Sequence, residues 1–529
     1  MRYIFLVVVV LTKAASIVPA QRISGSIDRP AEVSPVVNPG FLTHISQKGL
    51  NFVAAYARTR VANVLRTNVH YNFTGQLATK SFNFSLNGLK INRFNENFFL
   101  SQIDILSGLG FGWRVADLTL TTESSYRISS ANSKARGIAN IKAYRSMVDF
   151  LFSAQVGEDG RLNIVMEDCR FIINTVTVQF SQTSADLFVR FLPLINRMAK
   201  DKLQQLFCPT FAAEILPLLT DRLLHFSPTT NLFSRYFLNS ALLYSVAFRA
   251  QSIEMQHIGN SFVMLKQSGL SLNDFRLPYD APPLIASATN NEHMVNIFMS
   301  NHTLASLLFW MDQFSEFDYD LSPETAPTKE MAEYFMTECD KESVCAGTLF
   351  PSLSRKFPRS HVEIKVTSIT YPRVQIKADK IVVTMKSSVS GSVHRQRGNE
   401  SFLTAKMDGI YAIRNMKMVD YALFGKLELE SFIIADVVSQ IEEINTESME
   451  FLVTAFNDLV VAKDMATKLD KGIQLPKLID FEMLNARVTF EQDRIVVAAD
   501  LCAGNQCRNP VVAENSDSES VHYYDEVAT

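Results

Sequence analysis

Short stretches of alternating apolar and polar residues recur along this chain of 529 residues, and they limit its fold more than any other feature. Successive side chains of a strand point to opposite faces, so alternation indicates strands with one buried face and one face in water. Antiparallel sheets are built in this way. The clearest stretches are residues 82–87, 175–180, 362–367 and 484–490, and the segment GEDG at 157–160 predicts a hairpin turn.

Amphipathic helices are predicted where apolar residues repeat every three to four positions. Four stretches have this period: residues 50–65, 185–226, 294–314 and 447–469. Pro209 and Pro217 fall in the second stretch, and proline lacks an amide hydrogen, so we expect that helix to be kinked or broken there. Each half of the chain therefore has a helix, several strands, a longer helix and a closing strand, which predicts an α+β fold that occurs twice.

A proline-rich connector is predicted between the two halves. Residues 272–286 contain Pro278, Pro282 and Pro283, and proline restricts φ and removes hydrogen-bond donors. The sequence thus predicts a first domain over 21–271, the connector 272–286 and a second domain over 287–512. Residues 513–529 combine serines with acidic residues after the last apolar run, which is typical of a disordered acidic tail.

The first 20 residues have the layout of a secretory signal peptide. Arg2 precedes an apolar run over residues 4–11, and small residues follow up to Ala20. The run is too short to cross a bilayer as a helix, although an N-terminal membrane anchor is the alternative. We expect a secreted, extracellular protein from which residues 1–20 are removed.

An even number of cysteines in an exported chain predicts disulfide bonds. The six are Cys169, Cys208, Cys339, Cys345, Cys502 and Cys507. Their spacing lacks the paired C-x2-C and nearby histidines of zinc sites, so we expect no metal site. Sequons for N-glycosylation occur at Asn72, Asn83, Asn301 and Asn399.

Charge is distributed unevenly although the net charge is only −3. Residues 21–250 carry a net charge of +9 and residues 251–529 a net charge of −14. A positive first half favours anionic lipid headgroups or membrane surfaces, and compositional drift between two domains explains it equally well. The basic residues form no run of the kind that binds nucleic acid, so no nucleic-acid partner is expected.

Catalytic motifs are absent from the sequence. It contains no G-x-S-x-G elbow, no H-E-x-x-H and no phosphate-binding glycine loop, and its nine histidines are scattered. A Ser/His/Asp triad assembled from distant positions is the remaining catalytic alternative. We expect a protein that is not an enzyme and has no cofactor.

Five features occur in the same order as in a known family. They are PGFLTHISQKGLNF (39–52), the Cys169/Cys208 pair, LPYDAPPL (277–284), GTLFPSLSRKFP (347–358) and LDKGIQLPKLIDFEMLNARVTF (469–490). Together they resemble the lipid-binding serum glycoproteins, which include bactericidal/permeability-increasing protein, lipopolysaccharide-binding protein and the phospholipid and cholesteryl ester transfer proteins.

The resemblance implies a boomerang of two elongated half-barrels, each a curved antiparallel sheet around a long helix, joined by a central sheet. It also implies a Cys169–Cys208 disulfide and two apolar pockets for phospholipid acyl chains. Cys339–Cys345 and Cys502–Cys507 are possible local pairs, and long-range pairing of these four is equally economical. The candidate lining is Leu50, Val53, Ala57, Val61, Phe188, Phe191 and Ile195 in the first half, and Met294, Ile297, Phe298, Leu304 and Leu307 in the second.

Two functions follow from the resemblance. The first is a monomeric carrier or transfer protein for phospholipid or a related lipid, with transient contact to a membrane or lipoprotein surface. The second is an innate-immune protein that binds lipopolysaccharide or other bacterial envelope lipids. The chain departs from the family pattern at His44, where Arg is usual, and in residues 65–75 and 126–137, which have few of the lysines of lipopolysaccharide binders. These departures favour the carrier.

Overall fold

The computed structural model describes the chain between residues 38 and 507, with gaps. The described ranges are 38–68, 70–77, 82–94, 101–130, 134–181, 192–224, 227–243, 246–263, 279–286, 292–326, 328–340, 343–395, 398–441, 444–469, 472–477 and 481–507. The predicted signal peptide, the predicted acidic tail and the first part of the predicted connector lie outside these ranges.

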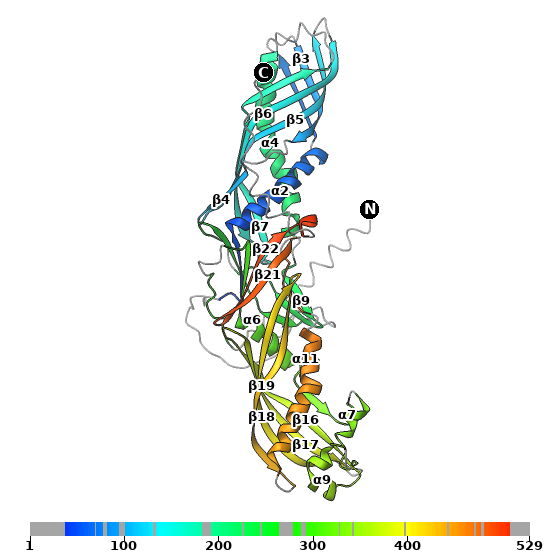
Figure 1. Cartoon of the computed structure of the whole chain (residues 1–529). Helices are drawn as coiled ribbons and strands as arrows, with labels where there is room; N and C mark the ends of the chain where they lie inside the picture. The colour runs from blue at the N-terminus through cyan, green and yellow to red at the C-terminus, as the bar shows by residue number, and fades with distance from the viewer. Residues whose placement is uncertain are drawn as a thin grey trace, which may run out of the picture. The chain divides into compact units, whose positions relative to one another are not determined.

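The first half of the chain contains a seven-stranded antiparallel sheet in which the order β2-β3-β5-β6-β7 forms the main path (Figure 1). Its strands are β2 (His70–Leu77), β3 (Phe82–Phe94), β4 (Ser101–Leu106), β5 (Gly110–Ser130), β6 (Lys134–Val156), β7 (Leu162–Ile172) and β8 (Thr175–Phe180). The alternation predicted in β8 is confirmed, because Val176 and Val178 are buried and their neighbours are not. The predicted hairpin turn joins β6 to β7, and Gly160 there has φ +71°, which favours glycine.

Two long helical segments pack against this sheet. They are α2 (Gln47–Asn68) and a segment built from α4 (Leu192–Thr210), a π-helical turn η1 (Phe211–Ile215) and α5 (Leu216–Leu224). Pro209 and Pro217 flank the π-helical turn, and the helical segment continues through both, so the helix is not broken there and a π-turn interrupts its α-helical hydrogen bonding instead. A π-turn re-satisfies the backbone: the Leu216 amide donates to the Phe211 carbonyl, five residues back.

The second half repeats this plan with a six-stranded sheet in the order β15-β16-β17-β18-β19-β20. The strands are β15 (Tyr319–Leu321), β16 (His361–Ile376), β17 (Ile381–His394), β18 (Glu400–Val419), β19 (Ala422–Ser439) and β20 (Ile473–Gln474). Its helices are α6 (Asn301–Gln313), α7 (Lys329–Glu333), α8 (Ala346–Leu349), α9 (Pro351–Lys356), and a segment of α10 (Thr446–Phe456), the π-turn η2 (Asn457–Val461) and α11 (Ala462–Leu469). A smaller sheet has the order β13 (Ser261–Val263), β10 (Tyr236–Asn239) and β9 (Thr229–Phe233).

A central sheet receives three strands from each half. Its order is β11 (Ala247–Phe248), β12 (Ser252–His257), β1 (Phe41–Ser46), β14 (Val295–Ser300), β22 (Arg494–Cys502) and β21 (Glu482–Glu491). The half-barrel architecture and the shared central sheet that the sequence predicted are therefore confirmed. Because both halves contribute to one sheet, the domain limits 21–271 and 287–512 stay predictions.

Strands β1 and β14 meet in a locally two-fold arrangement. They pair antiparallel, and each leads directly into a helix, α2 or α6. The last residue of each strand bonds to the chain just before the other strand: the Ser46 hydroxyl donates to the His293 carbonyl at 2.7 Å, and the Ser300 hydroxyl donates to the Gly40 carbonyl at 2.8 Å. The two halves that share the repeated α+β pattern are thus joined through their equivalent strands, β1 and β14.

The predicted helix over 294–314 is wrong in its first part. Residues 295–300 form strand β14, and the helix α6 begins only at Asn301. Every residue of β14 is buried, because the strand lies in the middle of the central sheet with side chains covered on both faces. Such a strand has no alternation of apolar and polar residues, so its apolar run cannot be distinguished from a buried helix by periodicity.

Tyr279–Ala286, the described part of the predicted connector, contains no helix or strand. Its Leu284 is buried on the central sheet in a cluster with Leu42, Phe298 and Val496. The Asn38 amide donates to the Ala281 carbonyl at 2.7 Å. The extended proline-rich segment therefore covers one face of the central sheet.

His257 provides a pH-dependent element of this sheet. Its imidazole is fully buried, stacks on Phe41 at a centroid distance of 4.2 Å, and lies 2.9 Å from the Ser240 carbonyl and 3.1 Å from the Thr43 hydroxyl. These contacts suit a neutral ring that donates to the carbonyl and accepts from the hydroxyl. Burial lowers the pKa of His257 from 6.5 to about 4, because the charged form loses its hydration.

We expect the free energy of unfolding to fall as the pH drops from 6.5 towards 4, because the unfolded chain takes up a proton at His257 first. The contribution of this residue is about 3 kcal/mol. Urea denaturation at pH 7 and pH 4.5 measures it. His257→Gln, which cannot titrate, should show a shallower pH dependence than the wild type; equal slopes would contradict the assignment.

Candidate functional site

An apolar cavity of about 110 Å³, here called the distal cavity, lies inside the second-half sheet. Strands β16, β17 and β18 supply Val366, Val389 and Met407, and α10 supplies Met449 and Leu452 from the opposite side. Among the residues that the structure describes, 23 line it, and of these Tyr334 alone has a polar side-chain group. Such a lining offers many apolar contacts and few groups that could orient a polar substrate.

A second apolar cavity of about 90 Å³, here called the α6 cavity, lies further along the inner face of the same sheet. Its walls include Leu304 and Leu307 of α6, Val383 of β17 and Met465 of α11. Tyr411 of β18 also contributes, and burial raises the pKa of its hydroxyl to about 12, so the ring is neutral.

Consecutive residues of the π-turn η2 line the two cavities. Val460 lines the distal cavity, and the next residue, Val461, lines the α6 cavity. A π-turn widens the helix locally, and such turns occur frequently at functional sites. The inner face of the sheet therefore presents an extended apolar surface opposite the α10–η2–α11 segment.

One buried hydroxyl beside the distal cavity has no hydrogen-bond partner among the residues that the structure describes. It belongs to Tyr319, whose ring packs edge-on against Phe456, a lining residue, at a centroid distance of 5.4 Å. Burial raises the pKa of this hydroxyl, and Asp464 raises it further. An unpaired buried hydroxyl is costly, so Tyr319 can donate to a polar group that enters this region.

A third cavity of about 40 Å³ lies on the central sheet. Phe41, Ile297 and Met299 line it, together with Phe481, against which Phe52 of α2 packs at a centroid distance of 5.3 Å. Helix α2 therefore belongs to both halves: one side faces the first-half sheet, and the other covers residues of the second half.

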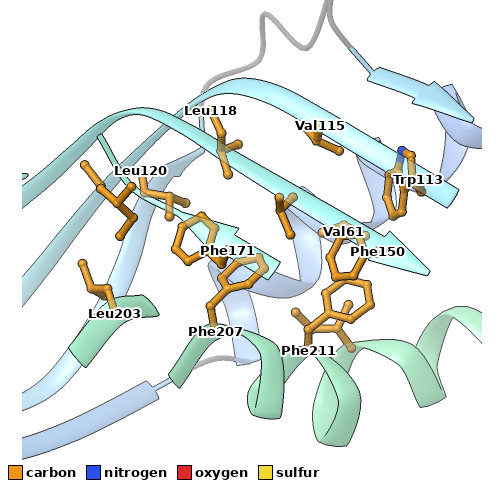
Figure 2. Close-up of a cluster of buried hydrophobic side chains, with 14 of the residues drawn as sticks. Val61, Trp113, Val115, Leu118, Leu120, Phe150, Phe171, Leu203, Phe207 and Phe211 are labelled. Atoms are coloured by element: carbon orange, nitrogen blue, oxygen red, sulfur yellow. The ribbon is translucent and has the colours of Figure 1, made fainter. Parts of the chain in front are cut away.

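The described first-half lining residues lie in or against two hydrophobic clusters, and their role in binding lipid stays a prediction. Leu50, Val61 and Ile195 are buried in one hydrophobic cluster, and Ala57 packs against it. Figure 2 shows Val61 beside aromatic rings of this cluster. The ring centroids of Phe150 and Phe211 are 4.2 Å apart. Val53 instead packs against the second-half cluster, while Phe188 and Phe191 lie outside the described residues.

The predicted second-half lining residues separate into three places. Leu304 and Leu307 line the α6 cavity, and Ile297 lines the central-sheet cavity. Phe298 points to the other face of the central sheet, beneath the connector, and Met294 packs against the second-half core. Most of the lining from β16–β19 and α10 was missed, because alternation indicates a buried face without identifying what covers it.

Three disulfides are present in the described residues. Cys169–Cys208 joins β7 to α4, as the resemblance implied. The other four cysteines, whose pairing the sequence left open, form the local pairs Cys339–Cys345 and Cys502–Cys507.

The four sequons lie in different settings. Asn399 is exposed, whereas Asn301 is half-buried at the start of α6 and the hydroxyl of its sequon residue Thr303 is buried on the Gly40 carbonyl. The side chains of Asn72 and Asn83 lie outside the described residues. Glycosylation at the four sites stays a prediction.

Comparison with known proteins agrees with this geometry. A model of the C-terminal domain of the LBP / BPI / CETP family matches residues 230–503. Bactericidal permeability-increasing protein from Sebastes schlegelii is 18% identical over 475 residues, covering 88% of this chain and 95% of the relative. The protein of the same name from Rattus norvegicus is 18% identical over 482 residues, covering 89% and 95%.

The fold is also similar to a solved structure. The crystal structure of lipopolysaccharide binding protein superposes with a TM-score of 0.58 at 14% identity, over 88% of this chain and 100% of that chain. Within the described part of the chain, no helix is both long and apolar enough to cross a membrane. From the family model, which covers more than half of its length, this chain belongs to the LBP / BPI / CETP family.

Proposed function

We propose that this chain is a secreted lipid-binding protein that shelters the acyl chains of a phospholipid or related lipid in apolar cavities. The observation that carries the proposal is the pair of cavities along the inner face of the second-half sheet, both lined almost entirely by apolar side chains. The predicted first-half pocket, with Phe188 and Phe191 in its lining, is part of the same proposal.

Acyl chains suit these cavities energetically. Each buried methylene contributes about 0.8 kcal/mol, so two acyl chains hold a lipid without specific headgroup contacts. The Tyr319 hydroxyl supplies one hydrogen-bond donor beside the distal cavity, where an ester carbonyl could accept from it. Binding of this kind requires no catalytic group, and we infer that the protein is not an enzyme.

Lipid extraction tests the proposal directly. The natively secreted protein should be purified without detergent and its lipids extracted. Quantitative mass spectrometry should then find phospholipid in a molar amount comparable to that of the protein chain. After its lipid has been removed, the protein should take up phospholipid again when it is incubated with phospholipid vesicles. A chain that carries no lipid when purified and takes none up from vesicles would exclude the function.

Recognition of bacterial envelope lipid is the second candidate, and one surface favours it. Arg127 of β5 lies directly opposite Arg136 of β6, with Lys134 two residues away on the same face. All three side chains are exposed. Like charges opposite each other destabilise a sheet unless an anion binds between them, and the phosphates of lipopolysaccharide are such anions.

We nevertheless expect weak binding to lipopolysaccharide, because three exposed cations are screened at physiological salt. Surface plasmon resonance in about 0.15 M salt should give no affinity in the nanomolar range. At low salt we expect weak residual binding, and the variant Arg127→Ala/Arg136→Ala should lose it. Nanomolar affinity that this variant abolishes would establish the second candidate function instead.

A further inference from the structure

We propose that the outer face of the second-half sheet contains a zinc site formed by His361, His394 and Glu363, with Glu324 as the fourth ligand. The two histidines are directly opposed in the ladder between β16 and β17. Their rings are stacked with centroids 4.9 Å apart. Residues two apart on a strand share a face, so Glu363 points to the same side as His361.

The donor atoms of these side chains are already close together. One ligand atom from each of His361, Glu363 and His394 lies within 4.8 Å of the others. His394 Nδ1 is 3.7 Å from a Glu363 carboxylate oxygen, and His361 Nε2 is 3.7 Å from a Glu324 carboxylate oxygen. Ligands of a tetrahedral zinc ion lie roughly 3.3 Å apart, since each bond is about 2.0–2.1 Å, so rotation of the side chains alone can close the site.

The chemistry of the set fits zinc. Imidazole nitrogen and carboxylate oxygen are ligands that Zn²⁺ accepts, whereas Ca²⁺ and Mg²⁺ prefer ligand sets made only of oxygen. Two neutral imidazoles and two carboxylates also balance the charge of a divalent ion. The Asn399 amide donates to the second oxygen of Glu363 at 2.8 Å, which holds the carboxylate with its other oxygen towards His394.

Two neighbouring cations that the structure describes have partners of their own. Arg395 pairs with Glu400 and lies over the Phe357 ring, and Lys365 pairs with Asp320. The four proposed ligands are partly exposed, with relative side-chain exposures between 23% and 67%, so an ion can enter from solvent.

The proposed zinc site lies at the open end of the β16–β17 ladder, close to the distal cavity. His361 begins β16 and His394 ends β17, so both lie at the open end of the ladder. The next pair inwards, Val362 and Val393, points to the inner face, where Val362 lines the distal cavity. A bound ion would hold together β16, β17 and the turn after β15 at this end of the cavity.

Zinc titration of the chelator-stripped, natively secreted protein tests the proposal, with any glycan at Asn399 in place. Isothermal calorimetry with ZnCl2 should give one saturable site per chain. His361→Ala/His394→Ala should weaken binding by about tenfold or more, since loss of even a supporting group costs that much. His522→Ala removes a histidine of the acidic tail and is the matched control; it should bind as the wild type does.

Histidine modification provides a readout on the unaltered chain. Zinc should protect His361 and His394 together from carbethoxylation by diethylpyrocarbonate, mapped by mass spectrometry, and Mg²⁺ should not. The proposal is overturned if the wild type has no saturable site, if the double variant binds zinc with unchanged affinity, or if neither histidine is protected. Loss of binding in His522→Ala alone would assign the ion to the tail.

Discussion

Replacing both Cys169 and Cys208 by alanine is expected to lower the free energy of unfolding by about 4 kcal/mol. The disulfide closes a loop with a sequence separation of 39 residues, and it joins β7 of the first-half sheet to α4, which packs on that sheet. In the chain-entropy description, a longer loop restricts the unfolded chain more and stabilises the fold more. Denaturation by urea, monitored by circular dichroism, measures the change.

The Cys502–Cys507 pair is a matched control, because the double alanine variant also removes two sulfur atoms. Its sequence separation is only 5 residues, so the same description gives a loss of about 2 kcal/mol. If both variants lose the same free energy of unfolding, the Cys169–Cys208 disulfide between strand and helix stabilises the fold no more than a local disulfide does.

Filling the distal cavity is expected to reduce the lipid bound per chain by at least half while leaving the fold intact. Ala405 of β18 is buried and lines this cavity, so Ala405→Trp places an indole where an acyl chain would lie. Because space is available, the free energy of unfolding should change by less than about 1 kcal/mol. Quantitative mass spectrometry of extracted lipid and thermal denaturation of the same sample measure both effects.

Ala139→Trp distinguishes a cavity from a packed core. Ala139 is fully buried in the first-half cluster and lines none of the three cavities described above. We expect this substitution to destabilise the fold by about 1–3 kcal/mol. If Ala405→Trp destabilises as much and bound lipid is unchanged, the distal cavity is ordinary core and does not hold lipid.

Local periodicity predicted the elements that have one covered face. Strand β8 was found because Val176 and Val178 alternate with polar residues, and helix α2 because its apolar residues follow a helical period. In β8 the side chains on one face meet protein and those on the other are more exposed, and in α2 the buried Leu50, Ala54 and Val61 recur at the helical period, so the sequence records which residues leave water. Strand β14 was misread because it has no such difference.

The sequence predicted less of the lining of the cavities than it did of the helices and strands. Leu304 and Leu307 were correctly placed on a helix facing an apolar interior, yet the opposite wall, including Val383 and Met465, was not identified. Those residues lie many positions away along the chain, and their strands and helices are brought to the α6 cavity only by sheet pairing. The opposed histidines of β16 and β17 escaped notice for the same reason, since 33 positions separate His361 from His394.

By itself the sequence determined the family resemblance, the repeated α+β pattern and the Cys169–Cys208 pair. The tertiary structure alone decided that β1 and β14 join the two halves, which apolar faces enclose a cavity, and which close on each other as core. The physical reason is that a residue pattern records whether a side chain leaves water, which is a local property. What it meets there depends on contacts between distant segments, which are fixed only when the chain has folded.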